Sequence, residues 1–381
     1  MAKSSDLQQE DELFRQLCKR FTRDEIIDHT FEWEEAGGFP RDLYRTAGRL
    51  GILGAGYPEA YGGAGGDSYL SLIAAEELLW GGSTGVVVGL QSHGISLPAL
   101  MHLGTEVQKQ RWVPHVLSGE KVAALAVTEP GAGSDVAGIQ TKAERNADGY
   151  LLNGQKLYIT SGTRADVVIV LARTSDSPHG GLTFFVVEKD MPGFSSSQPL
   201  KKTGWWASDT AELFFDNVQL SENHRLGSEG SGFGTVMQTF LGERLFLAYL
   251  GHQTAHIAFT DALEFCRTRH LFGRTLGKFQ ISKHKLARMK TQIEVARTFN
   301  YRLTERLRAG EMPIAEVAMA KNFSADVAQQ VTYDAVQLLG GMGYMRETRA
   351  ERLSRDARLL PIGGGTSEVM NEIIAKFGLQ L

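Results

Sequence analysis

The hydrophobic period of this 381-residue chain changes twice, and the changes divide it into three parts. Residues 6–121 and 233–381 repeat their apolar side chains at the spacing of helices. Residues 122–223 instead hold short runs rich in β-branched and aromatic residues, bounded by Gly, Asp, Asn or Pro. Successive strands without intervening helices indicate an antiparallel sheet or barrel, so an α+β chain is predicted. The expected strands are 151–159, 167–172, 183–187 and 211–218, and the expected domains are 1–121 (N-terminal helical), 122–230 (middle β) and 231–381 (C-terminal helical).

Charge and cysteine content exclude several classes of function. The chain has 40 basic and 44 acidic residues, a net charge of −4, and no dominant charge run, so neither a nucleic-acid surface nor binding to an anionic membrane is predicted. Cys18 and Cys266 give no disulfide framework and no metal cluster. The first ten residues lack the features of a secretory signal, and no apolar run was found with the roughly 18 residues of a membrane span. We therefore expect a cytoplasmic protein without a metal site.

Two polar segments are the strongest candidates for a ligand site. AVTEPGAGSD covers 126–135, and NGQKLYITSG covers 153–162. Glycines allow close approach of a ligand, and successive backbone N–H groups in such a turn can hold an anion. Thr128 and Thr160 each place a hydroxyl at the end of an apolar run, where the edge of a planar polar ring could be bound. Taken alone, the spacing favours two strands and a polar turn without a ligand, because Gly-Ala-Gly-Ser is common and is not a full dinucleotide fingerprint.

Taken together, these two segments resemble the flavin-binding signature of the acyl-CoA dehydrogenases, and further similarity runs from about Phe21 to Ala375. The resemblance implies FAD as cofactor, a middle antiparallel β-barrel and a C-terminal four-helix bundle. Tyr158 stands where the family usually has Trp or Phe. The residues of this region implied to contact the flavin are Leu125, Val127, Thr128, Gly133, Ser134, Tyr158, Ile159 and Thr160.

One carboxylate lies on an apolar stripe of the C-terminal helical part. Val236, Glu243, Leu247 and Leu250 are 7, 4 and 3 residues apart, so they share one helix face. Burial on such a face disfavours the charged form and raises the pKa of a carboxyl group. Periodicity alone favours a structural glutamate, which pairs with a cation such as Arg244 or lies in solvent at the edge of the stripe.

The family resemblance favours a catalytic role for Glu243. Many members carry their base in a C-terminal segment similar to Ile-Tyr-Glu-Gly-Thr, whereas this chain has Gly364 at the position of that Glu. The isovaleryl-CoA and long-chain subgroups instead carry the base in an earlier Glu-Arg-Leu segment, here residues 243–245. The resemblance implies that Glu243 removes the α proton of an acyl thioester while the β hydride passes to FAD. The thioester oxygen would be polarised by the Gly364 N–H and a ribityl hydroxyl of FAD.

The same resemblance assigns further ligands, each with a structural alternative. Arg269, Phe272 and Gln280 would reach the FAD of a neighbouring subunit. The structural alternatives are a helix-end cation for Arg269, a core aromatic for Phe272 and a solvated amide for Gln280. Since ligands would cross between subunits, a homodimer or a homotetramer is implied. The remaining FAD ligands would be Gln337, Gly340, Gly341, Thr366, Ser367 and Glu368, and the substrate-binding residues would be Ser134, Arg244, Gly363, Gly364 and Gly365. The structural alternatives to these roles are a helix-ending loop at residues 340–343 and an N-cap at Thr366.

The sequence constrains the identity of the acyl group and of the electron acceptor less than it constrains the residues of the site. Gly363 replaces a bulky Tyr of straight-chain enzymes and Gly364 removes a carboxylate, which predicts a larger pocket for a branched or bulky acyl-CoA, such as isovaleryl- or citronellyl-CoA. A long straight chain stays open. Leu241 stands where many members have an Asp that binds the pantetheine. Electron-transferring flavoprotein is the implied acceptor; the alternatives are a flavin oxidase or monooxygenase that uses dioxygen, and a non-catalytic acyl-CoA-binding relative.

Two other motifs are predicted to be structural. His93 lies in a mostly apolar helical stretch, 92–103, where a hydrogen-bonded core histidine is expected rather than a ligand or a base. Trp205 and Trp206 lie in the loop KKTGWWASDT, and packing is the favoured reading over a place near the flavin.

Overall fold

The computed structural model describes residues 2–381, with the side chains of 9–381. The helices are α1 (Ala2–Phe21), α2 (Thr30–Ala36), α3 (Asp42–Arg49), α4 (Tyr69–Leu78), α5 (Thr84–Leu90), α6 (His93–Leu103), α7 (Glu106–Leu117), α8 (Gly232–Thr268), α9 (Gln280–Arg308), α10 (Ile314–Leu339), α11 (Arg349–Ala357) and α12 (Ser367–Ile374). The strands are β1 (Ala123–Ala126), β2 (Lys142–Asn146), β3 (Gly149–Thr160), β4 (Val167–Arg173), β5 (Leu182–Glu188), β6 (Phe194–Ser196), β7 (Thr210–Leu220), β8 (Arg225–Leu226), β9 (His270–Leu271) and β10 (Arg274–Thr275).

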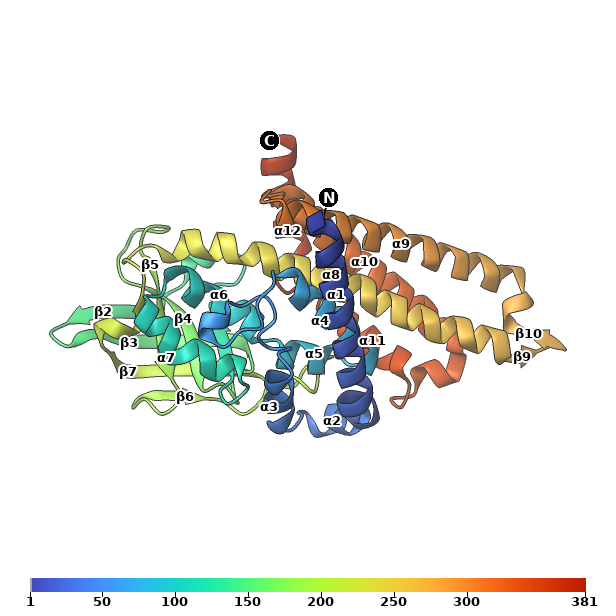
Figure 1. The fold of residues 1–381 in the computed structure, drawn as a ribbon, viewed down its shortest axis with the longest axis horizontal. Helices are drawn as coiled ribbons and strands as arrows, with labels where there is room; N and C mark the ends of the chain where they lie inside the picture. The colour runs from blue at the N-terminus through green and yellow to red at the C-terminus, as the bar shows by residue number, and fades with distance from the viewer. Residues whose placement is uncertain (1) are drawn as a thin grey trace.

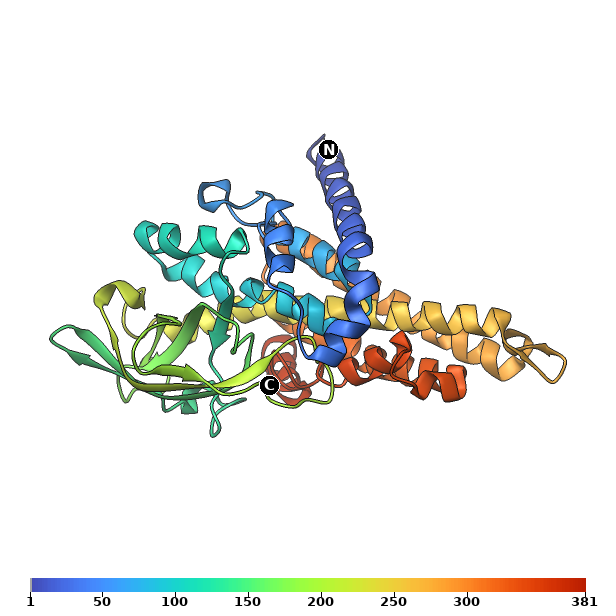
Figure 2. The ribbon, with the colours of Figure 1, turned by 90° about the horizontal axis from the view of Figure 1, so that it is seen from below.

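The molecule is elongated, with the large sheet at one end and the long C-terminal helices at the other (Figure 1). Helix α8 runs from the sheet to the β9–β10 hairpin at the opposite tip, and the N-terminal helices lie along its middle (Figures 1 and 2). In the C-terminal part, α8, α9 and α10 are long, whereas α11 and α12 are short helices packed on α10. The predicted order of helical, β and helical parts is confirmed.

The sheet is mixed and open rather than an antiparallel barrel. Its strand order is β6-β7-β3-β2-β4-β5-β8, and β1 joins it by pairing with β4. Most neighbours are antiparallel as predicted, but β1 and β2 both run parallel to β4. A long excursion through β2 and β3 separates β1 from β4, which allows the chain to return in the same direction. The two end strands, β6 and β8, pair only with β7 and β5, so the expected closure of a barrel is not observed.

Strand β4 lies inside the sheet, where it pairs with β1, β2 and β5, and both of its faces are covered. Val167, Ile169 and Leu171 belong to one apolar cluster, which they share with residues of α6, α7 and the start of α8. Val168 and Val170 point into a second cluster formed by the other strands. A continuous run of β-branched residues is the sequence pattern of a strand buried on both faces.

Helix α8 connects the sheet to the helical bundle by changing its packing partners along its length. Val236 and Phe240 pack on the sheet-side cluster, and Leu245 packs in a cluster with α4, α9 and α10. Further along, α8 crosses α10 closely, since a Cβ added to Gly251 would lie 2.7 Å from the Ser324 carbonyl oxygen. The same helix therefore contacts both ends of the molecule.

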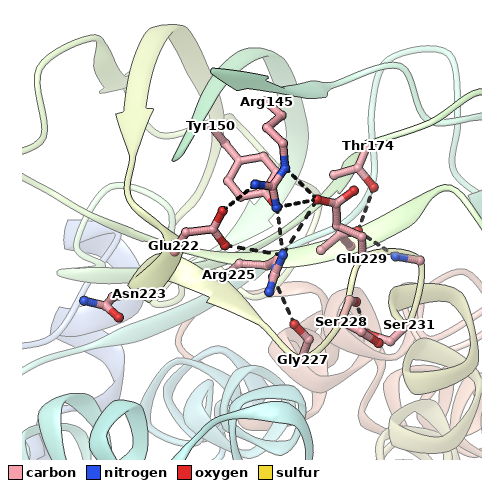
Figure 3. Close-up of polar contacts among 12 residues, drawn as sticks. Arg145, Tyr150, Thr174, Glu222, Asn223, Arg225, Gly227, Ser228, Glu229 and Ser231 are labelled. Carbon is pink, nitrogen blue, oxygen red and sulfur yellow. Dashed lines mark hydrogen bonds and ion pairs between the residues drawn. The ribbon is translucent and has the colours of Figure 1, made fainter. Parts of the chain in front are cut away.

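A polar network fastens the segment that leads into α8 to the sheet (Figure 3). Arg145 of β2 pairs with Glu222 at 2.9 Å and with Glu229 at 3.0 Å. Tyr150 of β3 donates its hydroxyl hydrogen to Glu229 and accepts a hydrogen bond from Arg225 at 2.9 Å. Exposed ion pairs are individually weak, but here several share the same partners. The network holds the chain three residues before α8 begins, which sets where that helix starts on the sheet.

The prediction that the chain has no apolar run of membrane-spanning length needs a correction at one stretch. Thr84–Leu103 is long and apolar enough to span a membrane, but 67% of it is buried inside the protein. The structure divides it into α5 and α6, with Pro98 inside the second helix. Both helices pack in the protein core, which explains their apolar composition.

Candidate active site

The two polar segments predicted from sequence lie against each other. The Leu157 N–H donates to the Thr128 carbonyl at 2.9 Å, which joins β3 to the loop after β1. Lys156 reaches the same loop, and its Nζ donates to the Val127 carbonyl at 2.9 Å and to Glu129 Oε1 at 2.8 Å. The segments around residues 126–135 and 153–162 therefore form a single structural unit.

The Lys156–Glu129 pair is almost fully buried and was missed by the sequence analysis. Glu129 also accepts hydrogen bonds from the backbone N–H groups of Gln140 and Thr141, at 2.6 and 2.9 Å. Burial lowers the pKa of Lys156 to about 8 against the opposing effect of Glu129. Burial would raise the pKa of Glu129, but Lys156 and these hydrogen bonds hold it below its ordinary value. The signal was present in sequence: Leu152 and Lys156 share the inward face of a strand with period two.

The surface of this unit is open and carries an exposed aromatic ring. A Cβ added to Gly131 would meet nothing within 4 Å, and one added to Gly133 would meet only Thr128, at 3.8 Å. Tyr158 is 66% exposed and has a φ of +61°, at a register shift between β3 and β7. A left-handed backbone at a bulky residue is uncommon and often marks a functional position. The ring and the glycine turn are therefore both accessible to a ligand.

The other predicted residues of this region differ in exposure. Thr128, Thr160 and Leu125 are half-buried, and Ser134 is exposed. The side chains of Val127 and Ile159 are buried in the two sheet clusters, so only their backbone groups are available to a ligand.

Glu243 lies on α8, shortly after the part of that helix that packs on the sheet. Phe240, one helical turn earlier, contacts the cluster that contains Leu125 and Val127. The predicted apolar stripe is confirmed, because Val236, Leu247 and Leu250 are buried. Glu243 itself is half-buried.

The alternative of an ion pair between Glu243 and Arg244 is wrong. Among the described residues, none forms a hydrogen bond or a salt bridge with the Glu243 carboxyl, and Arg244 Nε instead donates to the Gly364 carbonyl at 3.3 Å. Burial raises the pKa of Glu243 to about 7, although the charges of Arg244 and Lys321 oppose this rise. A carboxyl group of this kind can exchange a proton near neutral pH.

The glycine turn at 363–365 lies directly beside Glu243. Gly364 has a φ of +63°, and a Cβ added to it would lie 3.6 Å from Glu243 Oε1 and 2.4 Å from Leu247 Cδ1. The two positions at which family members would carry their base therefore meet in space. The expectation that Gly364 enlarges a pocket is not supported, since Leu247 and Glu243 fill the side-chain space. Only Gly363 leaves room: its added Cβ would meet no atom closer than 3.8 Å.

The Gly364 N–H has no backbone partner in the described part of the chain, whereas the neighbouring carbonyls are bonded. Gly364 O accepts from Arg244, and Gly365 O accepts from Lys321 at 2.7 Å. Lys321 is 1% exposed and was also missed from sequence. It follows Val317 by four residues and precedes Ala325 by four on α10, so it lies on the buried face of that helix, a position that helical periodicity could have revealed.

The predicted ligands near the end of α8 and α10 lie far from this site within one chain. Phe272 is at the tip of the β9–β10 hairpin, at the opposite end of the molecule from the sheet, and is 94% exposed (Figure 1). The hairpin turn is Phe272-Gly273, with both φ values positive, as in a type I′ turn. The other members of this group are exposed too: Arg269, Gln280, Gln337, Gly340 and Gly341.

Thr366 is the N-cap of the C-terminal helix α12, as its structural alternative predicted. Its hydroxyl accepts a hydrogen bond from the Val369 N–H at 3.3 Å and thereby caps α12. Ser367 is half-buried and Glu368 is exposed in the first turn of the same helix. These residues follow the glycine turn directly, so they lie at the site that contains Glu243.

The remaining alternatives also have clear outcomes. His93 is 7% exposed, and burial lowers its pKa to about 4 although backbone hydrogen bonds oppose the shift, which confirms a core histidine. Trp205 is 6% exposed and donates its ring N–H to the Asp356 carbonyl at 3.1 Å, which confirms packing. Leu241 is buried in the cluster of α4, α8, α9 and α10.

Models of the three parts of one protein family match almost the whole chain. The acyl-CoA dehydrogenase N-terminal domain matches residues 8–120, the middle domain 124–218 and the C-terminal domain 230–379. The chain is 40% identical over 370 residues to the mitochondrial long-chain specific acyl-CoA dehydrogenase of Sus scrofa, with 96% of this chain and 86% of the relative covered. It is 37% identical over 368 residues to the mitochondrial isovaleryl-CoA dehydrogenase of Arabidopsis thaliana, with 95% and 90% covered.

The fold is equally similar to solved structures. The acyl-CoA dehydrogenase of Geobacillus kaustophilus superimposes with a TM-score of 0.94 at 38% identity, and 98% of each chain is covered. The relatives named for long-chain and isovaleryl substrates confirm the resemblance drawn from residues 243–245. Sequence, domain order and fold together show that the chain belongs to the acyl-CoA dehydrogenase family, whose members are FAD-containing oxidoreductases.

Proposed function

We propose that this protein removes hydrogen from the α and β carbons of an acyl-CoA thioester to give the trans-2-enoyl-CoA, with Glu243 as the base. The observation that carries the proposal is the position of the Glu243 carboxyl, whose Oε1 lies 3.6 Å from the point that a Cβ at Gly364 would occupy. A carboxyl with a pKa of about 7 stands beside a backbone N–H without a backbone partner. This pairing provides a proton acceptor and an oxyanion donor in one place.

The residues of the loop after β1 fit a flavin. The open face at Gly131 and Gly133 leaves space for a ligand, and exposed Tyr158 offers an aromatic surface beside it. Thr128 and Thr160 provide hydroxyl groups at its edge. When bound, FAD would supply the two-electron acceptor for the β hydride. The residues proposed to hold it in the same subunit are Leu125, Val127, Thr128, Gly133, Ser134, Tyr158, Ile159, Thr160, Thr366, Ser367 and Glu368.

The protein itself would handle the proton and the developing negative charge. Glu243 takes the α proton, for which it must be ionised before the step. The Gly364 N–H donates to the thioester oxygen as electron density moves onto it. Arg244 fixes the Gly364 carbonyl, which belongs to the next peptide unit and so limits rotation of the backbone at Gly364. Ser134, Gly363 and Gly365 would complete the acyl-CoA site.

The substrate that we propose is a branched or otherwise bulky acyl-CoA, with a long straight chain as the alternative. The supporting observation is now Gly363 alone, since the space at Gly364 is filled by Leu247 and Glu243. A turnover panel from butanoyl- to hexadecanoyl-CoA, set against isovaleryl- and citronellyl-CoA, tests this choice. A strong preference for short linear chains would contradict it.

The assembly that we propose is a homotetramer built as a dimer of dimers, in the cytoplasm, with electron-transferring flavoprotein as acceptor. Phe272 fits a shared site, because its side chain is 94% exposed at the tip of a hairpin, at the opposite end of the molecule from the sheet of its own subunit (Figure 1). Arg269, Gln280, Gln337, Gly340 and Gly341 would then reach the FAD of a neighbouring subunit. Sedimentation of the protein and of a Phe272→Ser variant tests this arrangement.

The decisive experiment compares Glu243→Gln with the wild-type protein under anaerobic conditions. The variant should retain its yellow colour and bind acyl-CoA, yet bleach at least ~10²-fold more slowly, the low end for loss of a general base. Glu372→Gln on the exposed face of α12 is the matched control and should bleach at the wild-type rate. Near-normal bleaching of Glu243→Gln would refute the assignment. Rapid peroxide formation in air without another acceptor would indicate the oxidase alternative.

A further inference from the structure

Lys321 is a buried ammonium group beside the proposed base. It projects from α10, is 1% exposed, and donates from Nζ to the Gly365 carbonyl at 2.7 Å. No carboxylate oxygen of the described residues lies within 4.0 Å of Nζ. A buried charge is expected to be paired or to serve a purpose, because its removal from water is unfavourable.

The turn that contains Gly364 is fastened from two helices. Lys321 holds the carbonyl of Gly365, and its neighbour Asn322 donates to the Ser367 carbonyl at 3.1 Å. From α8, Arg244 holds the carbonyl of Gly364 at 3.3 Å. Side chains thus fix three carbonyls of the turn region, those of Gly364, Gly365 and Ser367, which limits the movement of the Gly364 N–H.

The net charge of Glu243 and its neighbours becomes more positive when Glu243 accepts a proton. The groups that face it are Arg244 on its own helix and Lys321 on α10, and Glu368 and Asp326 in turn face Lys321. While Glu243 is ionised, its negative charge offsets the nearby cations. Once it is protonated, the two cations lose that offset, and the negative charge developing on the thioester oxygen takes its place. The cations would therefore face one negative charge both before and after proton removal.

We propose that Lys321 is a positioning residue of the active site, which fastens the Gly365 carbonyl and thereby fixes the Gly364 N–H and a positive charge beside Glu243. This inference depends on the proposed function for its catalytic meaning. Its structural part, the influence of Lys321 on the ionisation of Glu243, does not depend on turnover.

The sign of the effect on Glu243 follows from the charges. Burial raises the pKa of Glu243, and Arg244 and Lys321 lower it. Burial also lowers the pKa of Lys321 to about 8, with Arg244 acting in the same direction and Glu243 opposing it. Removal of the Lys321 charge should consequently move the ionisation of Glu243 to higher pH.

The test uses three variants of the intact FAD-loaded protein. Lys321→Met removes both the charge and the hydrogen bond, Lys321→Arg keeps a cation with donors, and Asn322→Ala removes a neighbouring tether without a change of charge. The first readout is the infrared carboxyl band that Glu243→Gln abolishes, followed against pH without substrate. The second is the pH dependence of anaerobic flavin bleaching by acyl-CoA. Circular dichroism and thermal unfolding confirm that each variant is folded.

In Lys321→Met we expect the midpoint of the Glu243 band to rise by at least ~0.5 pH unit. We also expect bleaching to slow by about tenfold or more, in the range for displaced catalytic groups. Lys321→Arg should restore the midpoint, and Asn322→Ala should slow bleaching without moving the midpoint. A midpoint within about 0.2 unit of wild type in folded Lys321→Met would overturn the proposal. If wild type fails to bleach while the infrared midpoint still shifts, the proposed function fails and the role of Lys321 toward Glu243 stands.

Discussion

The carboxyl group of Glu243 and the side chain of Leu247 occupy the space into which a side chain at Gly364 would extend. An added Cβ at Gly364 would lie 3.6 Å from Glu243 Oε1 and 2.4 Å from Leu247 Cδ1. A contact of 2.4 Å is far inside van der Waals distance, so the end of the Leu247 side chain must move if a side chain is added at Gly364, and the left-handed backbone there adds strain. The location of the base and the identity of the glycine turn are therefore two aspects of one packing arrangement.

We expect Gly364→Ala to destabilise the fold by roughly 2–4 kcal/mol, because it combines a left-handed backbone with overpacking against Leu247. Urea unfolding monitored by circular dichroism measures the effect. Leu247→Ala in the same chain should relieve the overpacking, so the double variant should be more stable than the sum of the single changes predicts. Strict additivity would mean that the two side chains do not compete for space.

Relocation of the base should fail unless space is made for it. Glu243→Gly with Gly364→Glu transfers the carboxylate to the position used by other family members, but the new Cβ would lie 2.4 Å from Leu247 Cδ1, so that side chain must move. We expect bleaching by acyl-CoA to stay at the level of Glu243→Gln in this double variant. Adding Leu247→Ala should give a measurable gain of at least about tenfold. Activity in the double variant without the third change would show that the turn moves freely.

The pH dependence of flavin bleaching should report the ionisation of Glu243. Burial raises its pKa to about 7, and only the deprotonated carboxylate accepts the α proton, so the rate should increase with pH through about 7 and level off above it. Stopped-flow bleaching between pH 5.5 and 8.5 measures the midpoint. Glu372→Gln should show the same curve as wild type. A flat profile across this range would exclude Glu243 as the titrating base.

The buried Lys156–Glu129 pair should be needed for retention of FAD. Lys156→Met leaves Glu129 buried without its cation, which typically destabilises a protein by about 3–5 kcal/mol. We expect a lower ratio of flavin to protein absorbance and a lower urea midpoint. Lys156→Met combined with Glu129→Gln removes both charges and should recover much of the stability. If the single variant retains FAD like wild type, the pair does not shape the loop at Val127.

A second buried pair should make stability fall as the pH rises. Burial, together with Glu34, raises the pKa of Asp356 above its ordinary value. The folded state thus keeps a proton that the unfolded state has lost, so the stabilisation is complete below the unfolded pKa of about 3.8 and diminishes as the pH rises from there through the higher folded pKa. Glu34→Gln removes the neighbouring charge and should flatten this decline, as measured by thermal unfolding between pH 4.5 and 8. An unchanged slope would contradict the coupling.

Local pattern in the sequence determined the order of helical and β parts and the face on which Glu243 lies. Both follow from side-chain periodicity, which depends only on neighbours three, four or two residues apart. The cap at Thr366 followed for the same reason, since a cap is satisfied within its own first turn. The two segments around Thr128 and Thr160 could likewise be recognised, because they carry a short and specific pattern of residues.

The tertiary structure alone decided which groups meet across those elements. The parallel pairing of β1 with β4 depends on a strand about 40 residues later, and the filling of the Gly364 space by Leu247 depends on how α8 meets the turn before α12. Lys156 and Lys321 were placed on inward faces by the same periodicity, yet their partners come from distant segments. Periodicity indicates which face of an element is buried, whereas packing determines which residues lie opposite that face. The ionisation of Glu243 depends on those opposing residues.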